Sequence, residues 1–253
     1  MIQRIAKRAL LLAGGFGTRL RPLTDRLPKC LVPIGGRPLL ELWLDRLFLS
    51  NAEVSMDEVL VNTHYMPRSV DQFIAQSRWK SRVTIVHEPV LLGTAGTIRA
   101  NADWFGEQPF LLAHADNFSV FQLAQFQDVF SHRPSQCLGT MMTFSTDTPQ
   151  SCGIVHCDHR GIISQYWEKD SNAQGHLANA AVFLLDAKIH HVLAAHPNDS
   201  DFCGHTVPRL VGCLNTFHNS TYHRDIGTPH AYELAQADLR AGIVSLTEGL
   251  SHQ

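Results

Sequence analysis

The sequence predicts an α/β fold in which helices flank a mixed, mostly parallel central sheet. Short all-apolar runs alternate with segments of helical periodicity through the first half of the chain, and such runs are typical of strands that a parallel sheet buries on both faces. The alternating order of strand, helix and strand also indicates a parallel sheet. The second half changes to closely spaced strand pairs, which makes the sheet mixed.

Each element is predicted from its own pattern. Residues 9–13 form an all-apolar strand, and residues 38–48 carry large apolar side chains at helical spacing. We expect further strands at residues 58–62, 83–87, 110–113 and 138–144, and further helices at residues 97–104 and 121–130. The second half is expected to contain a hairpin of residues 153–155 and 162–167, strands at 179–185 and 222–226, and helices from about 187 and at 229–241, where Pro229 suits a first helical turn.

Composition excludes several classes of protein. The formal net charge is −2 and aromatic residues make up 8% of the chain, so we expect neither a nucleic-acid nor a membrane partner. Six cysteines include no C-x-x-C pair, which favours reduced thiols and a soluble, cytoplasmic protein. A metal cluster of Cys152, His156, Cys157 and His159 is the alternative to the hairpin there. Because no hexapeptide repeat is present, we expect no C-terminal β-helix.

A glycine-rich loop, Gly-Gly-Phe-Gly-Thr-Arg-Leu at residues 14–20, follows the first strand. Glycines let a backbone approach a polyanion, and Arg19 can bind phosphate oxygens. The loop lacks the Gly-Lys-Ser/Thr of a Walker A motif. It also lacks the third glycine of a Rossmann fingerprint, and the second strand ends at Asn62-Thr63 instead of an acidic residue, which argues against an NAD(P) enzyme.

The loop continues with Pro22-Leu23-Thr24 and Pro28-Lys29-Cys30-Leu31-Val32-Pro33, and residues 12–38 resemble the signature of the sugar nucleotidyltransferases. These enzymes make an NDP-sugar from an NTP and a sugar 1-phosphate. The resemblance extends over about residues 8–235 and implies a Rossmann-like (GT-A-like) nucleotidyltransferase fold. It implies one catalytic domain over residues 1–253, with a nucleotide-binding part at about 1–135 and a sugar-binding part at about 136–230.

The resemblance implies a role for each matching residue on the nucleotide side. Arg19 would bind the β- and γ-phosphates, and Lys29 would reach the α-phosphate and the incoming sugar phosphate. Cys30 stands where the family usually has proline. Residues 92–96 resemble the Leu-Gly-Thr-Ala-Gly loop of mannose 1-phosphate guanylyltransferases, which favours GTP. The structural alternative is that Thr94 or Thr97 caps a helix, and the two roles are compatible. The implied nucleotide-binding residues are Leu12, Ala13, Gly14, Gly15, Gly17, Thr18, Arg19, Glu88, Gly93, Thr94, Ala95 and Gly96.

Two aspartates far apart in the sequence are implied ligands of Mg²⁺. Asp116 follows a buried strand, where ligands of α/β sheets gather, and Asp225 lies in Asp-Ile-Gly-Thr-Pro, a family motif. Two carboxylates suit a Mg²⁺ ion that also binds the α-phosphate. The structural alternatives are a cap for the next helix at Asp116 and a turn before a helix at Asp225.

The implied sugar-phosphate ligands are Lys29, Asn117, Glu168, Lys169 and Asn179. Glu168-Lys169 resembles the family's Glu-Lys-Pro, with Asp170 in place of proline, and an exposed solvated pair is the alternative. Asn179-Ala180-Ala181 resembles Asn-Ala-Gly, with Ala181 in place of glycine.

The reaction implied is in-line attack of a sugar 1-phosphate on the α-phosphorus of an NTP, with Arg19, Lys29 and Lys169 as catalytic cations. GTP with a mannose- or heptose-type sugar is favoured over UTP or dTTP with a glucose-type sugar. A catalytically silent sugar-nucleotide-binding regulator is the alternative of another class. The sequence leaves the oligomeric state open, a homo-oligomer included.

Overall fold

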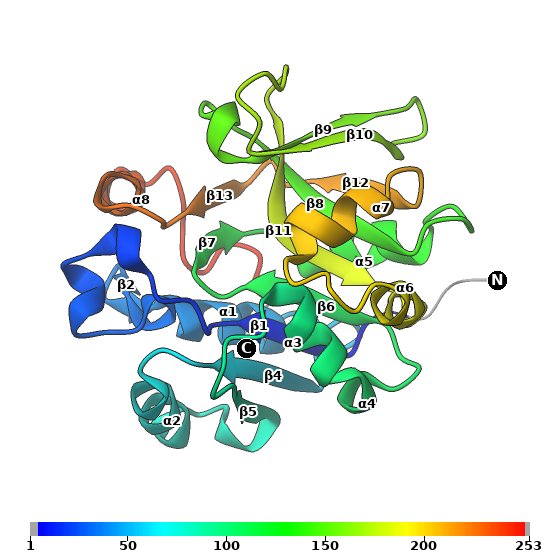
Figure 1. Cartoon of the computed structure of the whole chain (residues 1–253). Helices are drawn as coiled ribbons and strands as arrows, with labels where there is room; N and C mark the ends of the chain where they lie inside the picture. The colour runs from blue at the N-terminus through cyan, green and yellow to red at the C-terminus, as the bar shows by residue number, and fades with distance from the viewer. Residues whose placement is uncertain (1–4, 251–253) are drawn as a thin grey trace. The chain divides into compact units, whose positions relative to one another are not determined.

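Most of the predicted strands and helices are present in the computed structural model, which describes residues 5–250 (Figure 1). The chain forms two compact units that interleave along the sequence. Unit 1 contains residues 5–7, 92–112 and 125–220, and unit 2 contains residues 8–91, 113–124 and 221–250. The predicted parts were instead consecutive, so the two-part division of ligand binding stays a prediction.

Unit 2 contains the parallel part of the sheet. Strand β1 (Arg8–Leu12) pairs in parallel with β4 (Glu58–Thr63), and β4 pairs in parallel with β5 (Val83–His87). The strand order is β6-β1-β4-β5, where β6 (Phe110–His114) contributes its last residues to this unit. Leu10, Leu11 and Val61 are fully buried, as expected for strands covered on both faces.

Smaller elements of unit 2 surround these strands. They are the hairpin of β2 (Pro33–Ile34) and β3 (Arg37–Pro38), the antiparallel pair of β7 (Asn117–Val120) and β13 (Tyr222–Asp225), and helices α1 (Leu39–Phe48), α2 (Pro67–Gln76) and α8 (Pro229–Arg240). A buried cluster that includes Leu20, Val32, Phe118 and Ile226 holds the glycine loop, β7 and β13 together. The β7–β13 register places Asp225 opposite Asn117, directly beside Asp116 in the chain.

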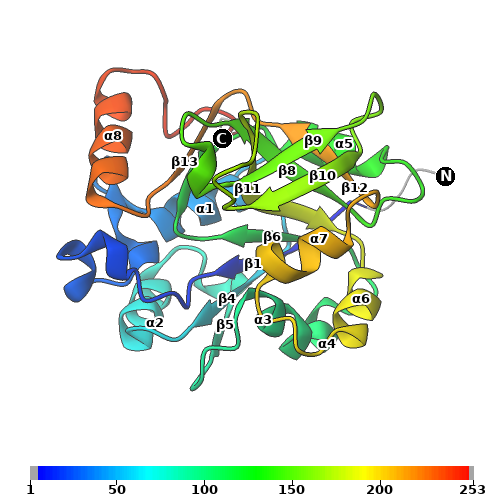
Figure 2. The same ribbon diagram turned by 45° about the horizontal axis from the view of Figure 1, so that its top comes forward.

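In unit 1 the strand order is β10-β9-β11-β6, in which β9 pairs antiparallel with both β10 and β11. Figure 2 shows the hairpin of β9 (Gly153–Cys157) and β10 (Ile163–Glu168) beside β11 (Leu177–Leu185). Strand β8 (Gly139–Ser145) pairs antiparallel with β11 and parallel with β12 (Leu214–His218). The helices of this unit are α3 (Thr94–Ala100), α4 (Ala102–Phe105), most of α5 (Leu123–Ser131), α6 (Ile189–Ala195) and α7 (Val207–Arg209).

The predicted fold class, a mixed sheet flanked by helices, is confirmed. The predicted helix 97–104 is wrong in its extent, because two helices meet at Asn101, whose side chain donates to the carbonyl of Thr97 and whose backbone leaves the helical region. Helix α2 and strands β7 and β12 were not predicted. Helix α2 buries only Val70 and Ile74, too few apolar residues to produce a clear helical period.

Three absences hold for residues 5–250. No group of three or more His, Cys, Asp or Glu side chains could hold a metal ion there, and the segment around Cys152 forms the predicted hairpin. The six cysteines are free thiols. No helix in this part of the chain is both long and apolar enough to cross a membrane.

Candidate active site

The glycine loop of unit 2 has a shape fixed by side chains from later in the chain. The backbone N–H of Ala13 donates to Asn62 Oδ1 at 2.8 Å, and Thr24 Oγ1 donates to the carbonyl of Gly17 at 2.8 Å. Gly17 has φ +63°, and a Cβ there would lie 2.9 Å from Thr24 Cγ2, so only glycine fits. Leu12, Ala13 and Gly14 are buried, whereas Gly15, Thr18 and Arg19 are exposed and available to a ligand.

Glu88 lies behind this loop and is 3% exposed. Its Oε1 accepts a hydrogen bond from Asn62 Nδ2 at 3.0 Å, while the other end of the same amide holds Ala13. Glu88 therefore orients Asn62 and, through it, the glycine loop. The sequence predicted Glu88 as a nucleotide ligand; in this structure its contact with Asn62 supports the loop.

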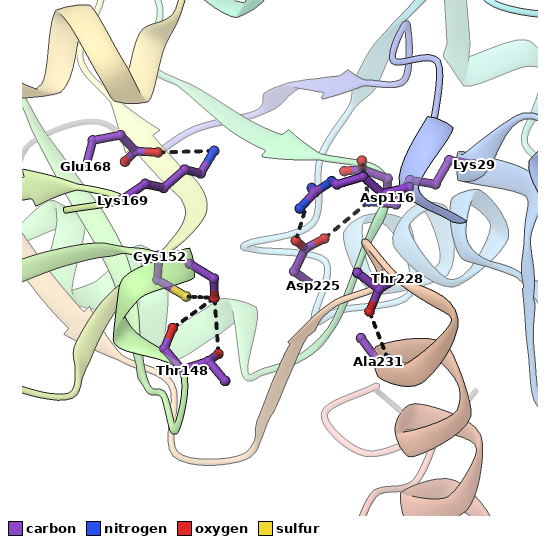
Figure 3. Close-up of polar contacts among 11 residues, drawn as sticks. Lys29, Asp116, Thr148, Cys152, Glu168, Lys169, Asp225, Thr228 and Ala231 are labelled. Carbon is purple, nitrogen blue, oxygen red and sulfur yellow. Dashed lines mark hydrogen bonds and ion pairs between the residues drawn. The ribbon is translucent and has the colours of Figure 1, made fainter. Parts of the chain in front are cut away.

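One buried ammonium group connects the two distant aspartates. Lys29 Nζ lies 2.8 Å from Asp116 Oδ2 and 3.2 Å from Asp225 Oδ1 (Figure 3). Burial opposes the charge of Lys29, but the two carboxylates outweigh it and the pKa of Lys29 is raised. Burial also opposes the charge of Asp116, yet Lys29 and His114 hold its pKa below the usual value. Lys29 and Asp116 are therefore both charged at neutral pH.

Arg19 extends the positive charge toward Asp225. Its Nη2 lies 3.9 Å from Asp225 Oδ2, and its side chain is 68% exposed. A Cβ on Gly227 would lie 2.8 Å from Asp225 Oδ2 and 3.2 Å from Arg19 Nη2. The glycine of the Asp-Ile-Gly-Thr-Pro motif thus leaves room for this pair.

The structural alternatives for the two aspartates do not hold: Asp116 caps no helix, and Asp225 is the last residue of strand β13 and not a turn residue. Helix α8 is capped by Thr228, whose Oγ1 accepts from the N–H of Ala231 at 3.2 Å (Figure 3). Asp116 is followed by strand β7 and not by a helix. Neither Asp116 nor Asp225 therefore caps a helix, and their common contact is Lys29.

The donor set fits a hard divalent cation. Mg²⁺ is commonly held by one or two carboxylates together with substrate phosphates, and Asp116 and Asp225 present oxygen atoms on the same ammonium group. A cation there would replace the Lys29 charge between them. The residues that would hold it are Asp116 and Asp225.

Asn117, a predicted sugar-phosphate ligand, is 6% exposed. Its backbone carbonyl accepts from Trp43 Nε1 at 2.9 Å, which anchors β7 to α1. The backbone of Asn117 therefore fixes the start of β7, directly after Asp116, and the Asn117 side chain is buried in unit 2.

The predicted base-binding loop of unit 1 is held by the segment that follows residue 199. Thr94 Oγ1 accepts from the N–H of Phe202 at 2.6 Å, and the N–H of Ala95 donates to the carbonyl of Ser200 at 2.9 Å. Gly93 has φ +76°, and a Cβ there would lie 2.5 Å from the Ser200 oxygen. Ala95 and Gly96 are buried. Neither Thr94 nor Thr97 caps α3 with its side chain, so that alternative is wrong.

Glu168 and Lys169 of unit 1 are joined by an ion pair of 3.5 Å (Figure 3). The Lys169 side chain is 63% exposed, but that of Glu168 is only 24% exposed because its Oε2 accepts a short hydrogen bond from the Tyr166 hydroxyl. Asn179 Nδ2 donates to the same hydroxyl at 3.3 Å. The structure thus brings Glu168 and Asn179 together through Tyr166, and the alternative of a freely solvated pair does not hold for Glu168.

Sequence reasoning missed three residues that shape these groups: Asn62, Thr24 and Tyr166. Asn62 carried a signal, because a polar residue ending a buried strand is placed where ligands gather. Thr24 stood in the Pro-Leu-Thr part of the resembling segment, but nothing in the sequence showed that its side chain, or that of Tyr166, would make these contacts.

The fold and these two clusters identify the class of the protein. The nucleotidyl transferase family matches residues 8–242, nearly the whole chain, and the chain belongs to that family. Members of this family generally use a divalent metal ion.

Individual relatives are more specific. The chain is 28% identical over 236 residues to the mannose-1-phosphate guanyltransferase of Aspergillus fumigatus (88% of this chain, 61% of that protein). It is 27% identical over 233 residues to mannose-1-phosphate guanylyltransferase 1 of Arabidopsis thaliana (89% and 62%). It therefore spans about three fifths of the length of these curated relatives.

A solved structure of UDP-glucose pyrophosphorylase complexed with UDP-glucose has the same fold. It superimposes with a TM-score of 0.76 at 18% sequence identity, and the match covers 94% of this chain and 100% of that one.

Proposed function

We propose that this protein transfers a nucleotidyl group from an NTP to a sugar 1-phosphate and releases pyrophosphate. GTP and a mannose- or heptose-type sugar phosphate are the favoured pair. The observation that carries the proposal is Lys29, which contacts both Asp116 and Asp225 and packs beside the glycine loop that presents Arg19. The Leu-Gly-Thr-Ala-Gly sequence and the guanylyltransferase relatives support GTP.

The reaction needs no nucleophilic side chain. An ionised oxygen of the sugar 1-phosphate attacks the α-phosphorus, the bond to the β-phosphate oxygen breaks, and pyrophosphate leaves with that electron pair. Since the attacking oxygen carries no proton, no general base is required. The residues of this chain contribute positioning and positive charge.

Each cation has a separate task in this proposal. The exposed Arg19 guanidinium binds the β- and γ-phosphates and neutralises the leaving pyrophosphate. Lys29 binds the α-phosphate after its ammonium leaves Asp116 and Asp225, and Lys169 binds the sugar phosphate. When bound by Asp116 and Asp225, Mg²⁺ supplies further charge neutralisation at the phosphate oxygens.

A pyrophosphate-release assay tests the proposal. The protein is assayed with each of four NTPs against mannose, heptose and glucose 1-phosphates in the presence of Mg²⁺. We expect the fastest release with GTP and a mannose- or heptose-type phosphate. Asp116→Asn and Asp225→Asn should lower kcat about a thousandfold, whereas Asp103→Asn, at an exposed position of α4, should not.

Other outcomes of the assay would favour other functions. Fastest release with UTP or dTTP and glucose 1-phosphate would favour the second candidate, for which the fold shared with UDP-glucose pyrophosphorylase is the supporting observation. Nucleotide-sugar binding without any release would favour a regulator. No release and no binding with any pair would refute the proposal.

A further inference from the structure

Tyr166 joins the two unit 1 side chains proposed to bind the sugar, yet the reaction described above gives it no role. Its hydroxyl donates a short hydrogen bond to Glu168 Oε2 and accepts one from Asn179 Nδ2 at 3.3 Å. The phenol therefore holds a carboxylate on β10 and an amide on β11 in one relative orientation.

The side chains of Tyr166, Glu168 and Asn179 have already used their hydrogen-bond donors on one another and on neighbouring residues. Both N–H groups of Asn179 are used, one on Tyr166 and one on Cys203 Sγ at 3.4 Å. Its Oδ1 accepts from the N–H of Ala181 at 2.8 Å and keeps one lone pair. Tyr166 uses its single proton on Glu168. What these three side chains can still offer a ligand is acceptors alone.

The space around the pair is closed on one side by β9. Gly153 lies opposite Glu168 in the β9–β10 register, and a Cβ there would lie 2.4 Å from Tyr166 Oη and 2.6 Å from Glu168 Oε2. Gly153 has no left-handed backbone conformation that would require glycine. A side chain at this position would therefore displace the Tyr166–Glu168 pair.

The proton of the phenol stays in place over the working pH range. Burial, followed by the nearby Cys203 and Glu168, raises the pKa of Tyr166 far above its ordinary value. Burial likewise raises the pKa of the Cys203 thiol, so Cys203 stays uncharged beside Asn179. The direction of the hydrogen bonds in the cluster does not change near neutral pH.

We propose that Tyr166 is a positioning residue for sugar binding: its hydroxyl orients Glu168 and Asn179 so that they accept, and do not donate, hydrogen bonds. The proposal rests on the proposed function, and it narrows the substrate to sugars that present hydroxyl donors to this cluster. A sugar whose hydroxyl there is replaced by fluorine would lose its hydrogen bond to the carboxylate, and a site built to bind a hydroxyl discriminates against an analogue that lacks it.

The test begins with Tyr166→Phe, which removes only the hydroxyl. We expect the KM for the sugar 1-phosphate to rise about tenfold, the size of one lost hydrogen bond to a charged group, while the KM for the NTP stays within about twofold. The matched control is Tyr232→Phe in α8, where the hydroxyl also has a side-chain partner, Gln236; it should change neither KM. Equal rises of both KM values in Tyr166→Phe would overturn the proposal.

A double-mutant cycle separates positioning from a general structural effect. In a Glu168→Ala background, Tyr166→Phe should raise the sugar KM less than it does in the wild type, because only Asn179 is then left for the hydroxyl to orient. Gly153→Ala provides an independent route, since it inserts a methyl group into the pair while keeping both side chains. It should raise the sugar KM selectively, as Tyr166→Phe does, and an unchanged sugar KM would count against the proposal.

Fluorinated substrates test the acceptor-only surface. Sugar 1-phosphates carrying fluorine in place of one hydroxyl at a time should include one that the wild type uses about fiftyfold less well, and Glu168→Ala should lose most of that discrimination. Equal use of all of them would refute the inference.

Wild-type turnover and calorimetric binding of the sugar 1-phosphate separate a failure of the proposed role of Tyr166 from a failure of the proposed function. Normal turnover with an unaffected Tyr166→Phe would refute the role of Tyr166 alone. Absence of both turnover and binding in the wild type would refute the proposed function and this inference with it.

Discussion

The ammonium group of Lys29 lies 2.8 Å from Asp116 Oδ2, although 87 residues separate the two in the sequence. The same nitrogen lies 3.2 Å from Asp225 Oδ1. A single buried cation therefore holds two carboxylates that would otherwise repel each other. This arrangement makes the charge balance of the cluster testable without an activity assay.

Lys29→Met should destabilise the protein and strengthen its response to Mg²⁺. Removing one partner of a buried ion pair costs about 3 kcal/mol, and the two freed carboxylates can then share a cation without displacing Lys29. Thermal unfolding with EDTA and with Mg²⁺ measures both effects. The rise in Tm on adding Mg²⁺ should be larger in Lys29→Met than in the wild type or in the exposed control Lys188→Met. Equal rises in all three proteins would argue against a cation site at these carboxylates.

Thr94→Val should lower the free energy of unfolding by about 1–3 kcal/mol, because the N–H of Phe202 loses its acceptor. Thr94→Ser keeps the hydroxyl oxygen and should be close to the wild type. Urea unfolding of the three proteins checks this. If valine and serine had the same effect, the hydrogen bond would not be what holds the loop.

Ala181→Gly should stabilise the protein by about 1 kcal/mol. Ala181 has φ +53°, at the point where the register between β11 and β8 shifts, and a side chain in that region is strained. Ala194→Gly in α6 is the control of opposite sign, since glycine in a helix lowers stability by about 1 kcal/mol. The denaturant midpoints of the two variants and the wild type measure these changes. A lower midpoint in Ala181→Gly would show that the Ala181 backbone is not strained.

His190 should make stability depend on pH. Its ring stacks on Phe105 and Phe110, and within residues 5–250 both ring nitrogens are buried without a hydrogen-bond partner. Burial, and to a lesser extent His191, lowers the pKa of His190 below 6.5. Protonation thus favours the unfolded state, so stability is complete above about pH 6.5 and falls as the pH decreases toward the folded pKa.

His190→Phe removes this titration. The loss of stability between pH 7.5 and pH 5.5, measured by urea unfolding, should be smaller in His190→Phe than in the wild type, by at most about 1.4 kcal/mol per pH unit. The exposed His159→Phe serves as control and should keep the wild-type difference. If His190→Phe kept the wild-type pH dependence of stability, groups other than His190 would be its cause.

Much of unit 2 was predictable from the sequence because its strands are buried on both faces. The all-apolar run at residues 9–13 is typical of such a strand, and Asp116, shortly after the end of β6, lies at the edge where ligands of α/β sheets bind. The resemblance then paired Asp116 with Asp225 and Lys29. The resemblance did not show how the two aspartates come together. In the structure, the four-residue strand β7 pairs with β13, and this pairing brings both carboxylates into contact with the Lys29 ammonium group.

The rest of the candidate site depends on packing that leaves no pattern in the sequence. Glu88 matched a motif, but its contact with Asn62 follows from how β4 and the residues after β5 lie side by side. Tyr166 stands in an alternating strand where any large residue would look the same. Its role emerges only from the distances to Glu168, Asn179 and Gly153.

A crystal structure with Mn²⁺ and a non-hydrolysable GTP analogue would show whether Asp116 and Asp225 hold a metal ion beside the nucleotide. We expect an anomalous manganese peak on the carboxylates of Asp116 and Asp225, with the Lys29 ammonium moved from these carboxylates onto a phosphate oxygen. Manganese bound away from both aspartates, or a triphosphate bound while Lys29 still contacts Asp116 and Asp225, would contradict this expectation.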